Sequence, residues 1–252
     1  MTKTLTGGNP AKLIFFFSLP LIIGNIFQQF YSMADTLIVG RTIGVNALAA
    51  VGCTGSITFL ILGFVQGLTS GLSIITSQKF GAKNEDDVRK SFAASILISS
   101  AVAIITTILS VLLARPLLEL LQTPSEIIDD AWAYLVIIFL GIPATVLFNL
   151  LSNAVRALGD SKTPLYFLIF ACCINIILDL VFILYFHLGV VGAGIATILS
   201  QLLSGILCIF FIIKKVPILR LKKTDFQMHY EVITSHLSIA LPMAFQMSII
   251  AI

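Results

Sequence analysis

The stretch AKLIFFFSLPLIIGNIFQQFYSMADTLIVG, residues Ala11–Gly40, decides the fold class of this chain. It is apolar and long enough to cross a lipid bilayer as one helix, because a span needs about 20 residues. Two of its residues are costly there. Pro20 removes a backbone hydrogen bond and kinks a helix, and a carboxylate such as Asp35 costs at least ~2.5 kcal/mol at membrane depth. A span that keeps both needs a functional reason.

The composition of the whole chain indicates a membrane protein. Of its 252 residues, 58% are hydrophobic and 11% are charged, and its mean hydropathy is +1.06. A soluble domain carries about a quarter charged residues, so we expect lipid to be the solvent. No basic face is interleaved with aromatics, which disfavours nucleic-acid binding. The four cysteines lie in apolar stretches without metal-ligand spacing, and we expect no cofactor.

Six complete spans are predicted, followed by the beginning of a seventh near Leu237. The six are Leu13–Val39, Leu48–Ser77, Phe92–Ala114, Ala131–Leu151, Leu165–Phe186 and Val190–Ile213. Pro143 is expected to kink its span, and Pro164 to stand in the first turn of the next one. We therefore expect an all-α membrane protein. Residues 1–213 would form a six-helix bundle, 214–236 a cytoplasmic loop, and 237–252 the start of a second bundle.

An internal repeat points to that second bundle. SLPLIIGNIFQ at Ser18–Gln28 is similar to ALPMAFQMSII at Ala240–Ile250, and both place Leu-Pro early in a span that follows a basic segment. The copies are separated by an even number of spans, which keeps them parallel, as in transporters built from parallel repeats. We expect the N-terminal portion of a protein about twice this size.

The distribution of Lys and Arg predicts the orientation. With the N-terminus in the cytoplasm, every Lys and Arg except Arg41 and Arg115 falls in a cytoplasmic segment. Such an excess is typical of the cytoplasmic loops of membrane proteins. We expect a multi-pass protein of the cytoplasmic (inner) membrane.

Asp35 and Asp179 are the only acidic residues expected inside spans, and both lie far along spans that run outward. Asn175 precedes Asp179 by one helical turn and shares its face, while Thr197 lies at the same depth in the sixth span. These four residues predict an oxygen-rich cation-binding site. Such a pocket suits Na⁺ and equally a proton, because a buried pair of carboxylates favours protonation. We expect no metal other than Na⁺ at Asp35 and Asp179.

Other polar residues are candidates for the lining of a cavity beside this site. Gln28 and Ser32 precede Asp35 at helical spacing, and Tyr31 and Tyr134 are aromatics that could face the cavity. The alternative for the tyrosines is packing or anchoring at the membrane interface. The alternative for Asn175 and Thr197 of the cation site is hydrogen bonding between neighbouring helices.

Motifs spread along the chain resemble those of one known family. ADTLIVG (Ala34–Gly40) and NALAAVG (Asn46–Gly52) lie in and after the first span, AVRALGDSKTPL (Ala154–Leu165) precedes the fifth, and NIILDLVFI (Asn175–Ile183) lies within it. In order and spacing they resemble the multidrug and toxic compound extrusion (MATE) transporters, over essentially the whole chain.

The resemblance implies a twelve-helix antiporter with two six-helix lobes, of which this chain would hold the N-lobe. Such a protein exports organic cations and other amphiphilic compounds by alternating access, driven by H⁺ or Na⁺. The resemblance also implies that Asp35, Asn175, Asp179 and Thr197 form an N-lobe cation site and that Pro20 is a conformational hinge. The partners would be small amphiphilic or cationic substrates, the bilayer, and a second lobe downstream of Ile252.

Two other functions stay open on the sequence. A lipid-linked saccharide flippase of the same superfamily would need intramembrane Arg or Lys for pyrophosphate, whereas each one here can be placed in a loop or at a helix end. An intramembrane aspartyl protease could use Asp35 and Asp179 as a dyad, but the Tyr-Asp and Gly-x-Gly-Asp contexts are missing. We therefore predict a transporter for multidrug efflux, not an enzyme.

Overall fold

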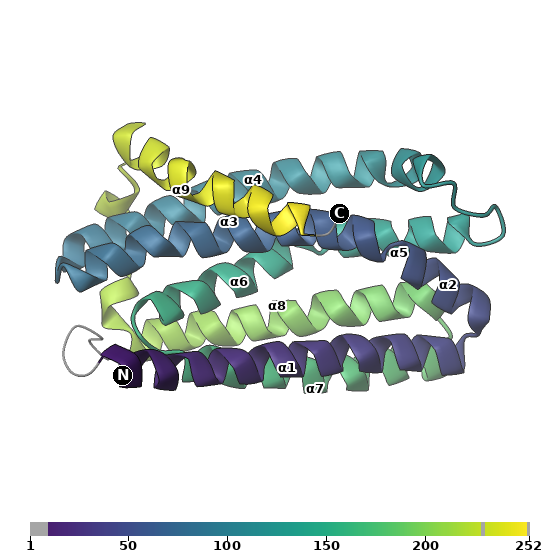
Figure 1. Cartoon of the computed structure of the whole chain (residues 1–252). Helices are drawn as coiled ribbons and strands as arrows, with labels where there is room; N and C mark the ends of the chain where they lie inside the picture. The colour runs from purple at the N-terminus through teal and green to yellow at the C-terminus, as the bar shows by residue number, and fades with distance from the viewer. Residues whose placement is uncertain (1–9, 228–229, 251–252) are drawn as a thin grey trace.

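A computed structural model describes residues 10–227 and 230–250 as a bundle of helices, with no strand among them (Figure 1). The α-helices are α1 (Pro10–Thr42), α2 (Val45–Cys53), α3 (Gly55–Gly81), α4 (Glu85–Leu120), α5 (Ile128–Leu140), α6 (Ile142–Ala157), α7 (Lys162–Leu180), α8 (Gly189–Lys215) and α9 (Tyr230–Ile249). A π-helical turn, η1 (Val181–Tyr185), extends α7, and two 3₁₀ turns, η2 (Pro217–Leu219) and η3 (Lys223–Phe226), follow α8. Residues 1–9 of the expected first bundle, 228–229 of the expected loop and 251–252 of the expected second bundle lie outside the described part.

The spans predicted from hydropathy are present. Six of the described helical segments are each long and apolar enough to cross a membrane, namely α1, α3, α4, α7 with η1, α8 and α9. Helices α5 and α6 form a further, broken span with a bend of 44°. With that pair counted as one, these are the six expected spans and the seventh, so the all-helical membrane fold is confirmed.

The bend between α5 and α6 has a local cause. Pro143 stands in the first turn of α6 and lacks the N–H that would continue the α5 ladder, as expected for a kink. Gly141 lies at the joint, where a Cβ atom would clash with Ile198 of α8. The bend therefore lets α8 pack directly against the joint.

The second span differs from its prediction. A continuous helix was expected over Leu48–Ser77, but α2 ends at Cys53 and α3 begins at Gly55. Thr54 donates its hydroxyl to Val51 O (2.7 Å) at a point where Gly52 and Gly55 favour the helix poorly. As a result α2 is a separate short helix, and α3 is the membrane span.

Polar residues define the starts of two of the long helices. Asn84 accepts a hydrogen bond from Asp87 N–H (3.2 Å) at the start of α4, an N-cap followed by acidic residues that suit the helix dipole. Asp160 Oδ1 accepts from the N–H groups of Lys162 and Thr163, each at 3.1 Å, at the start of α7. Pro164 lies in the first turn of α7, as predicted.

The packing places α8 against α5, α6 and α7, while α1 runs alongside α7 (Figure 1). Much of the α1 surface stays uncovered within the described residues, including the side chains of Phe15, Phe16 and Phe30. A long helix that exposes apolar side chains along its length is suited to lipid or to a further helix layer. Helix α1 is therefore held to the bundle mainly along the α7 face.

Helix α9 packs closely on α3 along a row of glycines. A Cβ atom at Gly71 would lie 2.6 Å from Ala240 Cα, and one at Gly67 would clash with Met243 O. Rows of small residues with this spacing let membrane helices approach to backbone contact. The start of α9 at Tyr230 precedes the expected Leu237, and Pro242 lies inside the helix.

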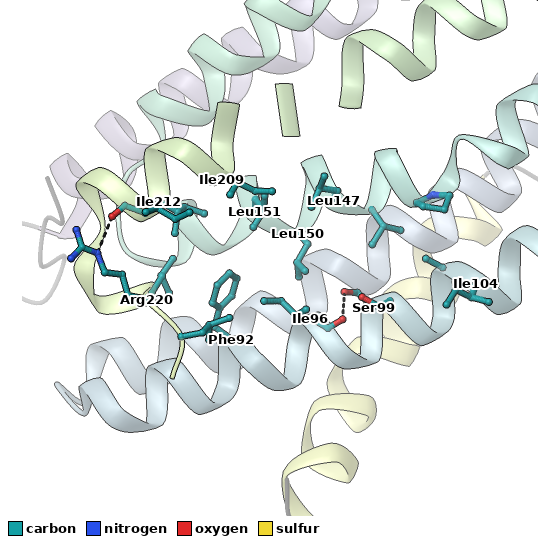
Figure 2. Close-up of a pocket in the computed structure, with 17 residues that line it drawn as sticks. Phe92, Ile96, Ser99, Ile104, Leu147, Leu150, Leu151, Ile209, Ile212 and Arg220 are labelled. Carbon is teal, nitrogen blue, oxygen red and sulfur yellow. Dashed lines mark hydrogen bonds between the residues drawn. The ribbon is translucent and has the colours of Figure 1, made fainter. Parts of the chain in front are cut away.

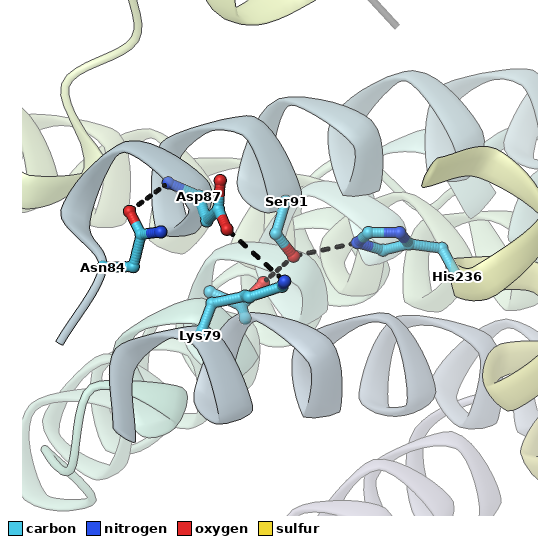
Figure 3. Close-up of polar contacts among 6 residues, drawn as sticks. Lys79, Asn84, Asp87, Ser91 and His236 are labelled. Carbon is cyan, nitrogen blue, oxygen red and sulfur yellow. Dashed lines mark hydrogen bonds and ion pairs between the residues drawn. The ribbon is translucent and has the colours of Figure 1, made fainter. Parts of the chain in front are cut away.

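A buried polar chain also ties α9 to the bundle (Figure 3). His236 Nε2 lies 2.8 Å from Ser91 Oγ on α4, and Ser91 Oγ lies 3.0 Å from Thr76 Oγ1 on α3. His236 Nδ1 lies 2.7 Å from Val232 O, which can only accept, so this nitrogen carries the proton. Ser91 therefore donates to His236, and Thr76 donates to Ser91.

The helix connections divide between two ends of the bundle (Figure 1). The start of α1 shares one end with the α3–α4, α6–α7 and α8–α9 connections, which contain most of the Lys and Arg. The α1–α2, α4–α5 and α7–α8 connections lie at the other end. This separation is the one that the charge distribution requires, and the membrane side of each end stays a prediction.

Candidate cation site

Asp35 of α1 and Asp179 of α7 lie face to face. Their carboxyl groups are within hydrogen-bonding contact of each other. Asp179 is 0% exposed and Asp35 is 8% exposed. The sequence placed both residues at one depth, and the structure adds that the parallel helices α1 and α7 turn them toward one another.

One oxygen of each carboxyl group lacks a hydrogen-bond donor within the described part of the chain. The Oδ1 atoms of Asp35 and Asp179 are both buried and have no donor among the described residues. Two buried carboxylates that are both ionised would repel each other in a region of low dielectric constant. A proton shared between them, or a hard cation held by their oxygens, would remove this repulsion. The donor set therefore fits either H⁺ or Na⁺.

Asn175 and Thr197 complete the polar cluster. The Asn175 side chain is 0% exposed and has one orientation in which both ends of its amide find partners. In this orientation Nδ2 donates to Asp179 Oδ2 (3.0 Å) and Oδ1 accepts from Thr197 N–H (3.2 Å). As predicted from the one-turn spacing, Asn175 and Asp179 share a face of α7. Asn175 thus links one carboxylate to α8.

Tyr31 connects α1 to the same cluster. Its hydroxyl lies 3.0 Å from Thr197 Oγ1 on α8. Tyr134 of α5 is buried and lies near both carboxyl groups. The two tyrosines suggested as cavity lining therefore lie at the cluster itself, one of them as a direct hydrogen-bond partner.

The structure does not bring Gln28 and Ser32 to the cluster. Both side chains are exposed within the described residues. Around the axis of α1, Tyr31 and Ser32 lie on either side of Asp35. Tyr31 is on the side that meets α8, whereas Ser32 is on the uncovered side. Gln28 and Ser32 therefore lie on the uncovered side of α1 beside the cluster, and their place in the lining of a cavity stays a prediction.

A π-helical turn follows Asp179 directly, and no sequence signal predicted it. Phe186 N–H bonds to Val181 O, five residues back, at 3.1 Å. Such turns are frequent at functional sites, where they re-aim a helix end. Here the turn forms the last part of the fifth span, which ends at Tyr185. Among the described residues, the carboxyl pair included, no group of three or more His, Cys, Asp or Glu could hold a metal ion.

The family model MatE matches residues 20–181, a range that contains Pro20, Asp35, Asn175 and Asp179. The chain belongs to the MATE family. This finding confirms the resemblance seen in the motifs.

Comparison with individual MATE relatives shows how much of their length this chain covers. It is 38% identical over 216 residues to "Probable multidrug resistance protein YpnP" of Bacillus subtilis, covering 83% of this chain and 47% of that protein. It is 25% identical over 236 residues to "Multidrug export protein MepA" of Staphylococcus saprophyticus, covering 93% and 52%. A solved structure of a multidrug resistance MATE family transporter, in an outward-facing conformation, matches with a TM-score of 0.89 at 26% identity, covering 97% and 55%.

The chain thus spans about half the length of the MATE proteins that it matches. Its six spans and the helix after them correspond to one half of that fold. The prediction of a half-length MATE fold, the six-helix N-lobe with the start of the seventh helix, is confirmed.

Proposed function

We propose that this chain forms the cation-binding lobe of an antiporter that exports organic cations and drugs across the cytoplasmic membrane, in exchange for H⁺ or Na⁺. The observation that carries the proposal is the contact between the buried carboxyl groups of Asp35 and Asp179. An ionisable residue inside a membrane span is a functional candidate by default, because its insertion is costly. Two in contact require a positive charge between them.

The pair supplies a mechanism for moving α1. When H⁺ or Na⁺ is bound, the carboxyl groups hold α1 against α7. When the cation leaves, the like charges repel, and α1 is the helix free to respond, because much of its surface is uncovered. Pro20 lacks the N–H that would bond to the carbonyl four residues earlier, so bending there breaks no hydrogen bond.

Coupling to substrate follows if the coupling ion and an organic cation compete for the same negative charge. Each would then favour a different conformation, which is the condition for one ligand to drive the other. The exposed side chains of Gln28 and Ser32 on α1 would face the transport cavity between the lobes. Asn175 and Thr197 would hold Asp179 in place on the α7–α8 wall while α1 moves.

The test is the efflux of a fluorescent organic cation from energised cells. Asp35→Asn should abolish coupled efflux while the protein remains in the membrane, because the pair loses the charge that binds the cation. Asp130→Asn, which removes an exposed carboxylate outside the pair, is the matched control and should export normally. Undiminished efflux by Asp35→Asn would contradict the proposal.

A further inference from the structure

A cavity of about 650 Å³ lies between α4, α6 and α8, and η2 with its flanking residues closes one end (Figure 2). Its walls are apolar, with Phe92 and Ile96 from α4, Leu147 and Leu150 from α6, and Ile209 from α8. None of its lining residues comes from α1, α3, α7 or α9. The groove is therefore separate from the carboxyl pair and from the surface on which α9 packs.

One end of this groove carries a positive charge. Arg220 follows η2 and lines the groove, and its Nε donates to Ile213 O at the end of α8 (2.8 Å; Figure 2). That bond fixes the guanidinium, while no acceptor among the described residues reaches Nη1 or Nη2. The two remaining nitrogens therefore form an open fork at the mouth of the groove.

The charge around Arg220 is not neutralised by the neighbouring acid. Lys214 and Lys215 end α8, and Lys222 and Lys223 lie in the connection that follows it. Asp225 is the acidic residue of η3, and its Oδ2 is engaged by Lys222 N–H (2.7 Å) and by Arg89 Nε (3.6 Å). The mouth is consequently cationic, and a cationic drug would be repelled from it.

The groove extends from this mouth into the apolar depth of the bundle. Its lining on α4 runs from Phe92 to Ile104, which is about 18 Å of helix at 1.5 Å per residue. One leaflet of a bilayer has about 15 Å of hydrocarbon. Ser99 lies on the wall, but its hydroxyl already donates to Ile96 O (3.1 Å), so it requires no polar ligand. The wall is suited to an acyl chain.

We propose that this groove binds an anionic phospholipid, with one acyl chain along α4 and the phosphate on the open fork of Arg220. Arginine forks match phosphate oxygens in pairs. Basic pockets between membrane helices at the cytoplasmic surface bind anionic head groups. The occupant therefore has an apolar chain long enough to fill the groove and a negative charge at one end.

Lipid binding to the purified protein tests the proposal, measured by native mass spectrometry during titration with phosphatidylglycerol and, separately, phosphatidylcholine. Phosphatidylglycerol should bind more tightly than phosphatidylcholine. Arg220→Gln should weaken it about fivefold, the effect of one cation at an anionic surface, and Arg220→Lys should restore part of the loss. Lys215→Gln removes a neighbouring charge outside the groove lining and should bind as the unchanged protein does.

A second pair of variants tests the acyl chain. Ser100→Trp adds bulk at an exposed position of the lining and should block the lipid, whereas Leu97→Trp adds the same ring at an exposed position of α4 outside the lining. Equal binding of the two phospholipids, unchanged binding in Ser100→Trp, or displacement by glycerol phosphate alone would each overturn the proposal. If Arg220→Gln fails to fold, the Trp pair decides.

Discussion

The carboxyl groups of Asp35 and Asp179 meet although they belong to the first and fifth membrane spans. The site exists only where α1 docks along α7, so the position of α1 and the state of the pair are linked. On the other side Asn175 and Thr197 anchor Asp179 to α8. Asp179 is therefore held by the packed pair α7 and α8, whereas Asp35 belongs to α1, which has an uncovered surface.

Asn175→Ala should impair both the stability and the export activity. The substitution leaves Asp179 Oδ2 without the Asn175 amide and Thr197 N–H without the amide oxygen. Loss of a buried hydrogen-bond partner costs about 1–3 kcal/mol. Thermal unfolding and efflux of a fluorescent cation measure the two effects. Asn25→Ala, at an exposed position of α1, is the control, and identical behaviour of the two variants would contradict the assigned role.

Tyr31→Phe should loosen α1 without emptying the space beside it. It removes the hydroxyl that lies 3.0 Å from Thr197 Oγ1 and keeps the ring, so a loss of about 0.5–1.5 kcal/mol is expected. Hydrogen–deuterium exchange of α1 should rise, since one contact with α8 is lost. Tyr166→Phe changes an exposed tyrosine and should leave the exchange as it was. Unaltered exchange in Tyr31→Phe would show that this contact does not hold α1.

Gly67→Ala should separate α9 from α3. The added Cβ would clash with the Met243 carbonyl, and backbone cannot give way as a flexible side chain can. Overpacking of this kind typically costs about 1–3 kcal/mol. Gly52→Ala in α2 meets nothing within 4 Å and should be neutral or slightly stabilising. Thermal unfolding of the two variants decides, and equal midpoints would contradict the close packing.

Ser91→Ala should weaken the junction of α3, α4 and α9 at one end of the bundle. It removes the donor to His236 Nε2 and the acceptor for Thr76 (Figure 3), at a cost of about 1–3 kcal/mol for the unpaired buried groups. Ser95→Ala is a demanding control, because Ser95 is equally buried but bonds only to Ser91 O of its own helix. A larger loss of stability against thermal unfolding in Ser95→Ala than in Ser91→Ala would contradict the expectation.

The sequence predicted the parts of the fold that depend on hydropathy and helical spacing. The spans, the kink near Pro143, the equal depth of Asp35 and Asp179, and the shared face of Asn175 and Asp179 all follow from them. What it could not provide is the side of an apolar helix that the bundle covers. Helix α1 carries polar residues such as Gln28 and Ser32 on its uncovered side, so they did not mark the face on which Tyr31 meets Thr197.

Breaks and distortions of the helical backbone could not be predicted from the sequence either. The separation of α2 from α3 at Thr54 and the π-helical turn after Asp179 arise from local hydrogen bonds. Apolar residues on either side of each break continue the same hydrophobic run, so hydropathy alone joins them. The early start of α9 at Tyr230 has a similar origin, because its first turns carry polar residues that hydropathy assigns to a loop.

Ion-driven transport in proteoliposomes tests whether the carboxyl pair couples export to an ion gradient. The protein is reconstituted, an inward or outward gradient of H⁺ or Na⁺ is imposed, and the movement of a labelled organic cation against its own gradient is measured. We expect one of the two ion gradients to drive transport, and Asp35→Asn combined with Asp179→Asn to abolish the driven component. Transport that remains coupled to the ion gradient in this double variant would contradict it.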